Sequence, residues 1–164
     1  TQHEFFIRRF LELKGLNIRD MKVYKRSTGC GEQFVRNNFL ERLKYYRSRT
    51  ASDKLIVMID EDSRGVQVRI DQLKSECEAK NVEFRKSNEA VMIAIPVRNI
   101  ETWIHYLNGN EISETKRYPK LMRQGDCKPA VIRLVEMCNN NEPITGCHSL
   151  VAACEEYNSF FENT

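Results

Sequence analysis

The stretch LIVMIDEDSRG, residues 55–65, decides the fold class. An uninterrupted apolar run leads directly into three consecutive acids, Asp60, Glu61 and Asp62. Such a run is typical of a strand that is covered on both faces, as in a parallel sheet. In open α/β sheets, ligands bind beyond the carboxyl ends of the strands. The three acids therefore stand where a parallel sheet would have a functional site.

The residues that follow predict the rest of a strand–helix–strand unit. An apolar stripe from Val66 to Cys77 has helical spacing. VMIAIPV, residues 91–97, is a second continuous apolar run. Because a helix that connects two strands of one sheet normally makes them parallel, we expect Val57 and Ile93 to be buried in neighbouring parallel strands.

The remaining sequence adds helices on both sides of this unit. Before the unit, periodicity and turn residues predict a helix ended by Gly15 and a half-exposed strand over 20–25. A turn at 27–34 then opens a helix whose apolar stripe is Val35, Phe39, Leu43 and Tyr46. After the unit, the same signals predict a helix from Ile100 to Leu107 and two helices over about 129–138 and 149–161. The expected fold class is α/β, with a mostly parallel sheet flanked by helices and a helical C-terminal flank. Residues 1–108 form the expected core, and residues 109–164 form a helical extension packed on it.

Composition indicates an ordinary globular chain in a reducing compartment. The 164 residues suit one domain with at most a small appendage. No apolar run approaches the roughly 20 residues that span a bilayer. The 6 cysteines have no C-x-x-C spacing, so we expect reduced thiols in a cytoplasmic protein without membrane contact. A net charge of +3 is too small to indicate a nucleic-acid partner by itself. A zinc site would need Cys138, Cys147, His148 and Cys154, whose spacing fits no common zinc pattern.

Asp60 and Asp62 are candidates for a divalent-metal site. They would project to the same side if the extended geometry of the strand continued through them, with Glu61 opposite. Two carboxylates that close repel each other unless a cation joins them, and hard cations such as Mg²⁺ or Mn²⁺ take oxygen ligands. The alternative is that the acids cap the following helix, whose dipole favours negative charge at its N-terminus.

VRNIETW, residues 97–103, supplies a further acid. Glu101 lies one residue into the helix that follows the second strand, and His105 is on the same helix face. If the strands are neighbours, Glu101 points to the same rim as Asp60. We then expect the two carboxylates to lie within about 8 Å of each other, close enough to share a metal ion or its waters. The alternative is a solvated helix face, and Trp103 is assigned to the core rather than to base stacking.

A basic stripe on the helix that follows residue 30 is a candidate nucleic-acid contact. Arg36, Lys44 and Arg47 lie on roughly one side of that helix, where they could follow a phosphate backbone. Such charged stripes are also common on solvated helix faces. STGCGEQF, residues 27–34, could bring a phosphate to the helix N-terminus or form a plain tight turn, and it lacks the spacing of known phosphate-binding loops.

Two short motifs resemble the Toprim domain of the OLD family (overcoming lysogenization defect) and related bacterial anti-phage defence nucleases. IDED, residues 59–62, is similar to a strand that ends in D-x-D, and RNIETW, residues 98–103, is similar to the R-x-I-E start of a later helix. The resemblance covers about residues 1–108 and implies a Toprim-like, Rossmann-like domain. Toprim domains also carry a Glu after their first strand. TQHEFFIRRFL, residues 1–11, resembles the helix after that Glu, so the first strand and its Glu are expected to precede residue 1.

The resemblance also implies a site and an activity. The site combines acids that hold a metal ion, cations that contact phosphate and one group for proton transfer. The acids are Asp60, Asp62 and Glu101, the last as a ligand or outer-shell acid; the cations are Arg69 and Arg98; and the proton-transfer candidate is His105. The implied activity is Mg²⁺- or Mn²⁺-dependent cleavage of DNA or RNA, with an ATPase as a candidate partner protein.

Two other functions fit part of the same pattern. A degenerate Toprim-like module would bind nucleic acid or a partner ATPase without catalysis. A phosphatase of the haloacid dehalogenase class also has its nucleophile in D-x-D after a strand. In that class a small residue pair usually comes next, whereas Ser63-Arg64 follows here, and no strand is predicted after residue 110.

Overall fold

Two parallel strands lie at the centre of the molecule. The computed structural model describes residues 1–25, 31–49 and 53–161. Strand β1 (Leu55–Met58) pairs with strand β2 (Val91–Ala94), and Val57 is directly opposite Ile93. Helix α3 (Val66–Glu78) connects them, and both paired residues are buried. The predicted strand–helix–strand unit is therefore confirmed, with both strands shorter than expected.

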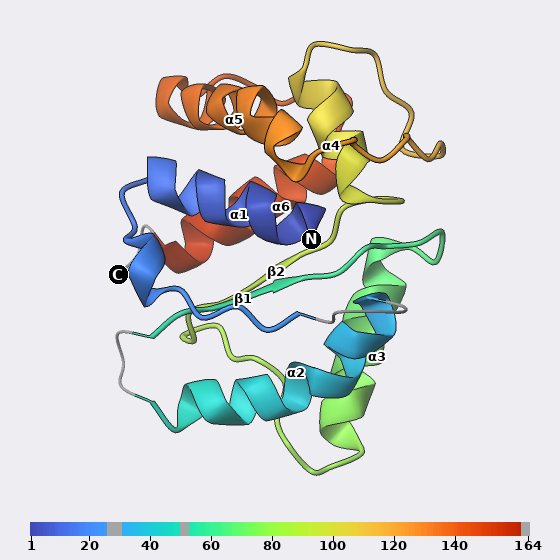
Figure 1. The fold of residues 1–164 in the computed structure, drawn as a ribbon. Coiled ribbons are helices and arrows are strands. Elements are labelled where there is room, and N and C mark those ends of the chain that lie inside the picture. Colours follow the sequence, from blue (N-terminus) through green and yellow to red (C-terminus); the bar gives the residue numbers. More distant parts are fainter. Residues whose placement is uncertain (26–30, 50–52, 162–164) are drawn as a thin grey trace.

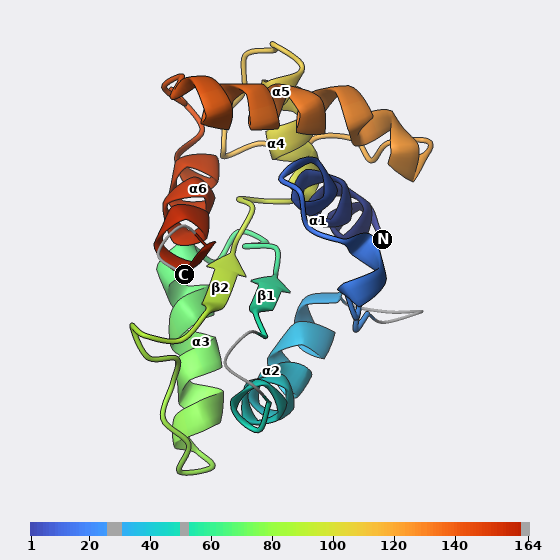
Figure 2. The same ribbon diagram turned by 90° about the vertical axis from the view of Figure 1, so that its left-hand side faces the viewer.

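Helices cover both faces of this small sheet (Figure 1). The helices on one face are α1 (Gln2–Leu13), α4 (Ile100–Leu107), α5 (Lys128–Asn140) and α6 (His148–Phe161). Helices α2 (Gly31–Arg47) and α3 cover the other face (Figure 2). Met92 and Ala94 belong to the first core, whereas Val57 and Ile93 belong to the second. The alternation of side chains along each strand explains the two cores, because successive residues point to opposite faces.

The helices after residue 109 pack on the α/β core, as the sequence predicted. Residues of α5 and α6 share one hydrophobic cluster with α1, α4 and one face of the sheet. Trp103 is buried in this cluster, and its Nε1 donates a hydrogen bond to Ser149 Oγ of α6 (2.8 Å). Trp103 is thus a core residue that ties α4 to α6. No helix in the described ranges is long and apolar enough to cross a membrane.

Residues 20–25 do not form the half-exposed strand that their alternation predicted. Ile18–Asp20 is a short 3-10 helix, η1, and residues 21–25 form no strand within the described part of the chain. Alternation by itself cannot make a strand without a partner edge. A smaller difference concerns the start of the last helix, expected at about residue 149: α6 begins at His148, so Ser149 lies inside its first turn. Of the turn predicted at 27–34, residues 27–30 lie outside the described residues.

Side chains close the outer edge of β2. Glu156 of α6 accepts a hydrogen bond from the amide of Ile93 (3.1 Å) and forms an ion pair with Arg85. Arg85 in turn donates to the carbonyl oxygen of Val91 (2.9 Å). An open edge of backbone amides and carbonyls invites pairing with another chain. Glu156 and Arg85 satisfy these groups instead, so the sheet ends at β2.

Replacing Glu156 by Ala should destabilise the fold by about 2 kcal/mol, because the edge amide and the half-buried guanidinium both lose a charged partner. Glu155→Ala, at the neighbouring exposed position, is the matched control and should change stability by less than about 0.5 kcal/mol. Urea unfolding measures both variants. Equal stabilities would contradict the edge-closing role of Glu156.

Candidate functional site

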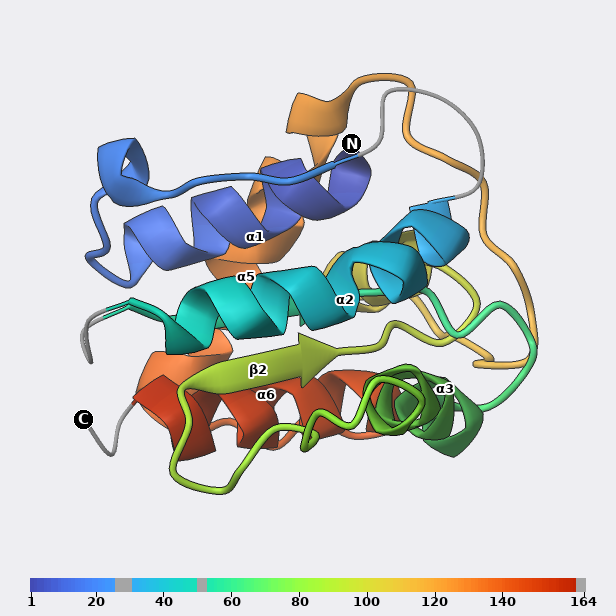
Figure 3. The ribbon, with the colours of Figure 1, turned by 90° about the horizontal axis from the view of Figure 1, so that it is seen from below.

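The carboxyl ends of β1 and β2 lie on the same side of the molecule as the start of α1 and the segment between α4 and α5 (Figures 1 and 3). We call this side the rim. Asp60 follows β1, Glu101 lies in the first turn of α4, and His3 lies in the first turn of α1. The parallel pairing of the strands is the reason that Asp60 and Glu101 share this rim.

Glu101 is a buried acid with an unfavourable environment. It is 6% exposed, and this burial raises its pKa above the ordinary value for a glutamate. The negative charge of Asp60 acts in the same direction, whereas the Glu101 amide, His3 and Lys120 lower the pKa. Asp60 and Glu101 therefore influence each other electrostatically, as expected of two acids at one rim. Their separation of about 8 Å stays a prediction.

His3 is a rim residue that sequence reasoning did not find. Its Nε2 lies 2.8 Å from Oδ1 of Asp60. Helical periodicity shows which face of a helix is buried, but it does not show where the helix begins relative to a distant strand. Glu4, also in the first turn of α1, accepts a hydrogen bond from Lys25 (2.5 Å), and this bond lowers the pKa of Glu4.

The chain turns after Asp60, so the extended geometry that would place Asp60 and Asp62 on the same side does not continue through Asp62. Asp62 and Ser63 have φ angles of 50° and 69°, in the left-handed region. Glu61 points into the protein, 6% exposed. Its carboxylate accepts hydrogen bonds from the amides of Ser63 (2.8 Å), Gly65 and Arg98 (3.3 Å). Backbone strain of this kind persists where surrounding contacts impose it, and here the buried carboxylate imposes it.

The three consecutive acids consequently have three different partners. Asp60 contacts His3, and Glu61 binds backbone amides. Asp62 is 48% exposed and forms an ion pair with Arg117 (2.5 Å). The chain accommodates three like charges in a row because each carboxylate has a partner of its own.

Two of the residues implied by the Toprim resemblance, Arg69 and His105, have contacts within the protein, and the proton-transfer role of His105 stays a prediction. Arg69 is 1% exposed; it donates to the carbonyl oxygen of Asp60 (3.0 Å) and pairs with Glu32. A guanidinium in this position cannot reach a phosphate, so the predicted phosphate contact at Arg69 is wrong. The ring of His105 stacks on Tyr118 with centroids 4.5 Å apart.

Arg98 joins the two loops that leave the strands. Its guanidinium donates to the carbonyl oxygen of Thr115 (2.7 Å) and to the hydroxyl of Ser63. Its own φ is 65°. Arg98 therefore lies at the rim, as the resemblance implied, while its phosphate contact stays a prediction.

The basic stripe on α2 is mostly occupied within the molecule. Arg36 pairs with Glu32 (2.5 Å), and Arg47 forms two hydrogen bonds with Glu89 (2.6 and 2.9 Å). The bond from Arg47 holds the pKa of Glu89 below its ordinary value. Lys44 is half-exposed beside another acid of α2. Arg47 thus fastens α2 to the segment before β2, and Arg36 is paired within α2 itself, which makes the stripe a weak candidate for nucleic-acid contact.

No three His, Cys, Asp or Glu side chains of the described residues converge to hold a metal ion. Neither the acids Asp60, Asp62 and Glu101 nor the four residues of the zinc alternative form such a group. The chemistry of the rim nevertheless suits a hard cation. Asp60 and Glu101 provide carboxylate oxygens, and the charged form of Glu101 is disfavoured by burial and by Asp60.

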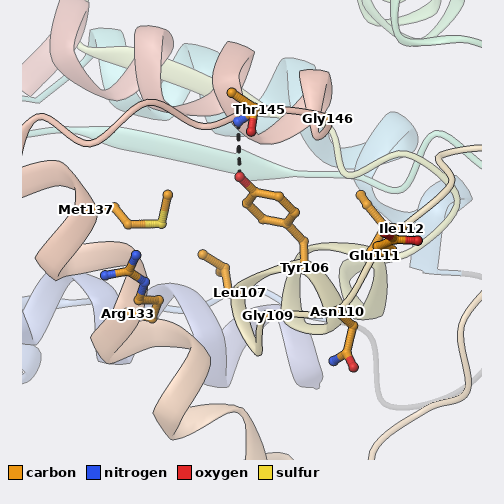
Figure 4. Close-up of a pocket in the computed structure, with 10 residues that line it drawn as sticks. All are labelled: Tyr106, Leu107, Gly109, Asn110, Glu111, Ile112, Arg133, Met137, Thr145 and Gly146. Carbon is orange, nitrogen blue, oxygen red and sulfur yellow. Dashed lines mark hydrogen bonds between the residues drawn. The ribbon is translucent and has the colours of Figure 1, made fainter.

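A hollow among the described residues lies away from the rim. It has a volume of about 480 Å³ and is lined by the end of α4, the following loop, α5 and the turn before α6 (Figure 4). Tyr106 crosses it, with its hydroxyl accepting a hydrogen bond from the amide of Thr145 (3.0 Å). None of the predicted site residues lines this hollow.

Replacing Glu101 by Gln should change the pH dependence of stability. Because the folded state raises the pKa of Glu101, it holds a proton at a pH where the unfolded chain has lost it, and stability falls as pH rises through this window. Gln removes that loss. The variant should therefore gain stability over wild type at about pH 7.5 but not at about pH 4.

Chemical unfolding at the two pH values measures this difference. Glu111→Gln, at an exposed position, is the control and should behave the same relative to wild type at both. A Glu101→Gln effect that is equal at both pH values would contradict an uncompensated buried charge.

Replacing Arg47 by Gln should destabilise the protein by about 2 kcal/mol, since Glu89 would lose its charged partner while half-buried. Lys44→Gln removes the same charge from the same helix and should cost less than about 0.5 kcal/mol, because exposed ion pairs contribute little. Thermal unfolding separates the two variants. Equal effects would show that the α2 stripe is a solvated face throughout.

Known proteins provide no family for this chain. No family model matches it, and no curated protein or solved structure does. The mixed α/β fold with a small parallel sheet stands on the structure itself. The resemblance to Toprim domains rests on the two motifs at 59–62 and 98–103, and the function has to be inferred from the rim.

Proposed function

We propose that the rim binds a divalent cation and cleaves phosphodiester bonds of nucleic acid. The observation that carries this proposal is that Glu101 is buried and that the charge of Asp60 raises its pKa further, with the two acids following neighbouring parallel strands. A buried carboxylate next to a second one costs stability unless a cation joins them. Mg²⁺ or Mn²⁺ fits the oxygen donors of these two side chains.

Each rim residue would have a distinct role. Asp60 and Glu101 would hold the cation, and His3 Nε2 would keep the Asp60 carboxylate in position, as second-layer partners of metal ligands do. When bound, a divalent cation orients the phosphate and activates a water molecule. Asp62 would join after its ion pair with Arg117 opens. That pair is exposed on both sides, so opening it costs less than about 1 kcal/mol.

The two motifs that resemble Toprim domains support the same reading. Asp60 belongs to the first motif and Glu101 to the second, and Arg98 of the second motif is hydrogen-bonded to Ser63, next to the first. This hydrogen bond joins two residues that are 35 positions apart in the sequence, so the two motifs lie close together at the rim. A site that uses both motifs together agrees with metal-dependent cleavage of DNA or RNA.

A binding module without catalysis is the second candidate. The observation that favours it is the partner set of the acids: Asp60 contacts His3, Glu61 binds amides and Asp62 pairs with Arg117. In this alternative the rim would recognise nucleic acid or a partner ATPase, and the acids would only shape the loops.

Asp60→Asn should abolish Mn²⁺-dependent cleavage of a labelled oligonucleotide, with a loss of about 100-fold or more, and should weaken Mn²⁺ binding measured by calorimetry. Asn keeps the size of the side chain but removes the charge that holds the ion. Asp62→Asn should also lose cleavage, while the fold of both variants is kept. Glu111→Gln is the control and should cleave like wild type.

Two results would oppose the proposal in different ways. If Asp60→Asn and Glu101→Gln cleave like wild type, the rim is not the catalytic site. If wild type binds nucleic acid but neither binds Mn²⁺ nor cleaves, the protein is a binding module.

A further inference from the structure

A basic segment lies across the rim, and three of its four cations form no ion pair with the described residues. We call residues 113–123, SETKRYPKLMR, the basic strap. It forms part of the long connection between α4 and α5, which follows the rim in Figure 3. Its tethers are the hydrogen bonds from Ser149 to Glu114, from Arg98 to Thr115, from Asn99 to Tyr118 and, one residue beyond its end, from Gln2 to Gln124. The strap therefore runs from the start of α6, over the strand ends, to the start of α1.

The charges of the basic strap are arranged in two layers. Its single acid, Glu114, faces inward and binds both the amide and the hydroxyl of Ser149 (2.9 and 2.6 Å). Its cations are all exposed: Lys116, Arg117, Lys120 and Arg123. Among the described residues, Arg117 is the only one of these four that forms an ion pair. The outer surface of the strap thus carries positive charge that the protein itself leaves largely unneutralised.

This surface is adjacent to the acids of the rim. Arg117 contacts Asp62 (2.5 Å), and the charge of Lys120 lowers the pKa of Glu101. Met122, between these cations and Arg123, is 99% exposed. Proteins that bind the minor groove insert apolar side chains, methionine among them, between base steps, and the exposed Met122 is available for such a contact.

We propose that the basic strap binds the phosphate backbone of nucleic acid and holds it against the rim. The inference rests on the proposed function for the role of the rim as the site of cleavage. The cations of the basic strap, which would bind nucleic acid, are separate from the acids of the rim. Lys116, Lys120 and Arg123 would contact phosphates directly. Arg117 would exchange its exposed partner Asp62 for a phosphate, which frees Asp62 at the moment that substrate arrives.

The strap differs from the stripe on α2, which was the candidate surface in the sequence. Arg36 and Arg47 of α2 already have carboxylate partners, and a phosphate would have to displace these. The unpaired cations of the strap lose only hydration and side-chain freedom on binding. Salt-dependent release of counterions then favours association with a polyanion.

The test compares two triple variants that lose the same charge. Lys116→Gln/Lys120→Gln/Arg123→Gln removes three strap cations and leaves the Arg117–Asp62 pair in place. Lys74→Gln/Lys80→Gln/Lys86→Gln removes three exposed lysines from α3 and from the segment between α3 and β2. Fluorescence anisotropy with labelled single-stranded and duplex DNA, in EDTA and over a series of salt concentrations, measures binding without cleavage.

The strap variant should bind at least about 10-fold more weakly, and the slope of log Kd against log salt should fall by about 2 for single-stranded DNA or about 3 for duplex. The control variant should stay within about threefold of wild type. Lys116→Gln alone should lower the slope by about one third as much, which keeps the test usable if the triple variant is unstable in thermal unfolding.

Three outcomes would decide between readings. Equal binding by the two triple variants would overturn the strap as the nucleic-acid surface, even if the protein cleaves. Loss of binding in the strap variant, combined with no Mn²⁺-dependent cleavage by wild type, would uphold the strap and overturn the proposed function. Strap-dependent binding to vesicles that contain anionic lipid, without binding to DNA or RNA, would overturn the choice of nucleic acid as partner.

Discussion

The carboxylate of Glu61 is the constraint on which the geometry of the rim depends. It is buried, and it accepts hydrogen bonds from two amides of its own loop and from the amide of Arg98 in the loop after β2. Hydrogen bonds to a charged group contribute about 1.5–3 kcal/mol each. They allow Asp62, Ser63 and Arg98 to adopt left-handed conformations that non-glycine residues disfavour. By joining the two loops, Glu61 sets where Asp60 and Glu101 stand relative to each other.

Local patterns were enough to predict the six α-helices and the two strands of the sheet in the described part of the chain. The parallel pairing of the strands followed from the helix that connects them. The apolar run before Asp60 and the helix of residues 66–78 depend on burial of the chain's own side chains, which periodicity records. The expected strand over 20–25 failed because a strand needs a partner edge, and no local pattern describes that edge. The turn after Asp60 could not be predicted from local patterns for a related reason. Its left-handed residues depend on an amide 37 residues away from Glu61, which no periodicity reports.

The arrangement of the candidate site was predicted in part, and the errors of that prediction have physical causes. The rule that ligands bind at strand ends brought Asp60 and Glu101 to one rim. His3 was missed because the position of α1 depends on packing with the later helices of the first core. Arg69 carried a signal that could have been used, since it stands one helical turn before Leu73 and two before Cys77, on the buried face of α3. A charged residue on that face must be paired inside the protein, as Arg69 is.

Electrostatic balance favours a site that acts on an anion with the help of a cation. Acids at the rim repel a polyanion, and the basic strap beside them offsets this repulsion. A surface that only bound nucleic acid would need the strap but not a buried carboxyl at its centre. Burial disfavours the charged form of Glu101, and the nearby charges of His3 and Lys120 oppose this effect only in part. Buried acids with a raised pKa are found where chemistry uses them, so the burial of Glu101 supports the proposed catalysis at the rim over binding alone.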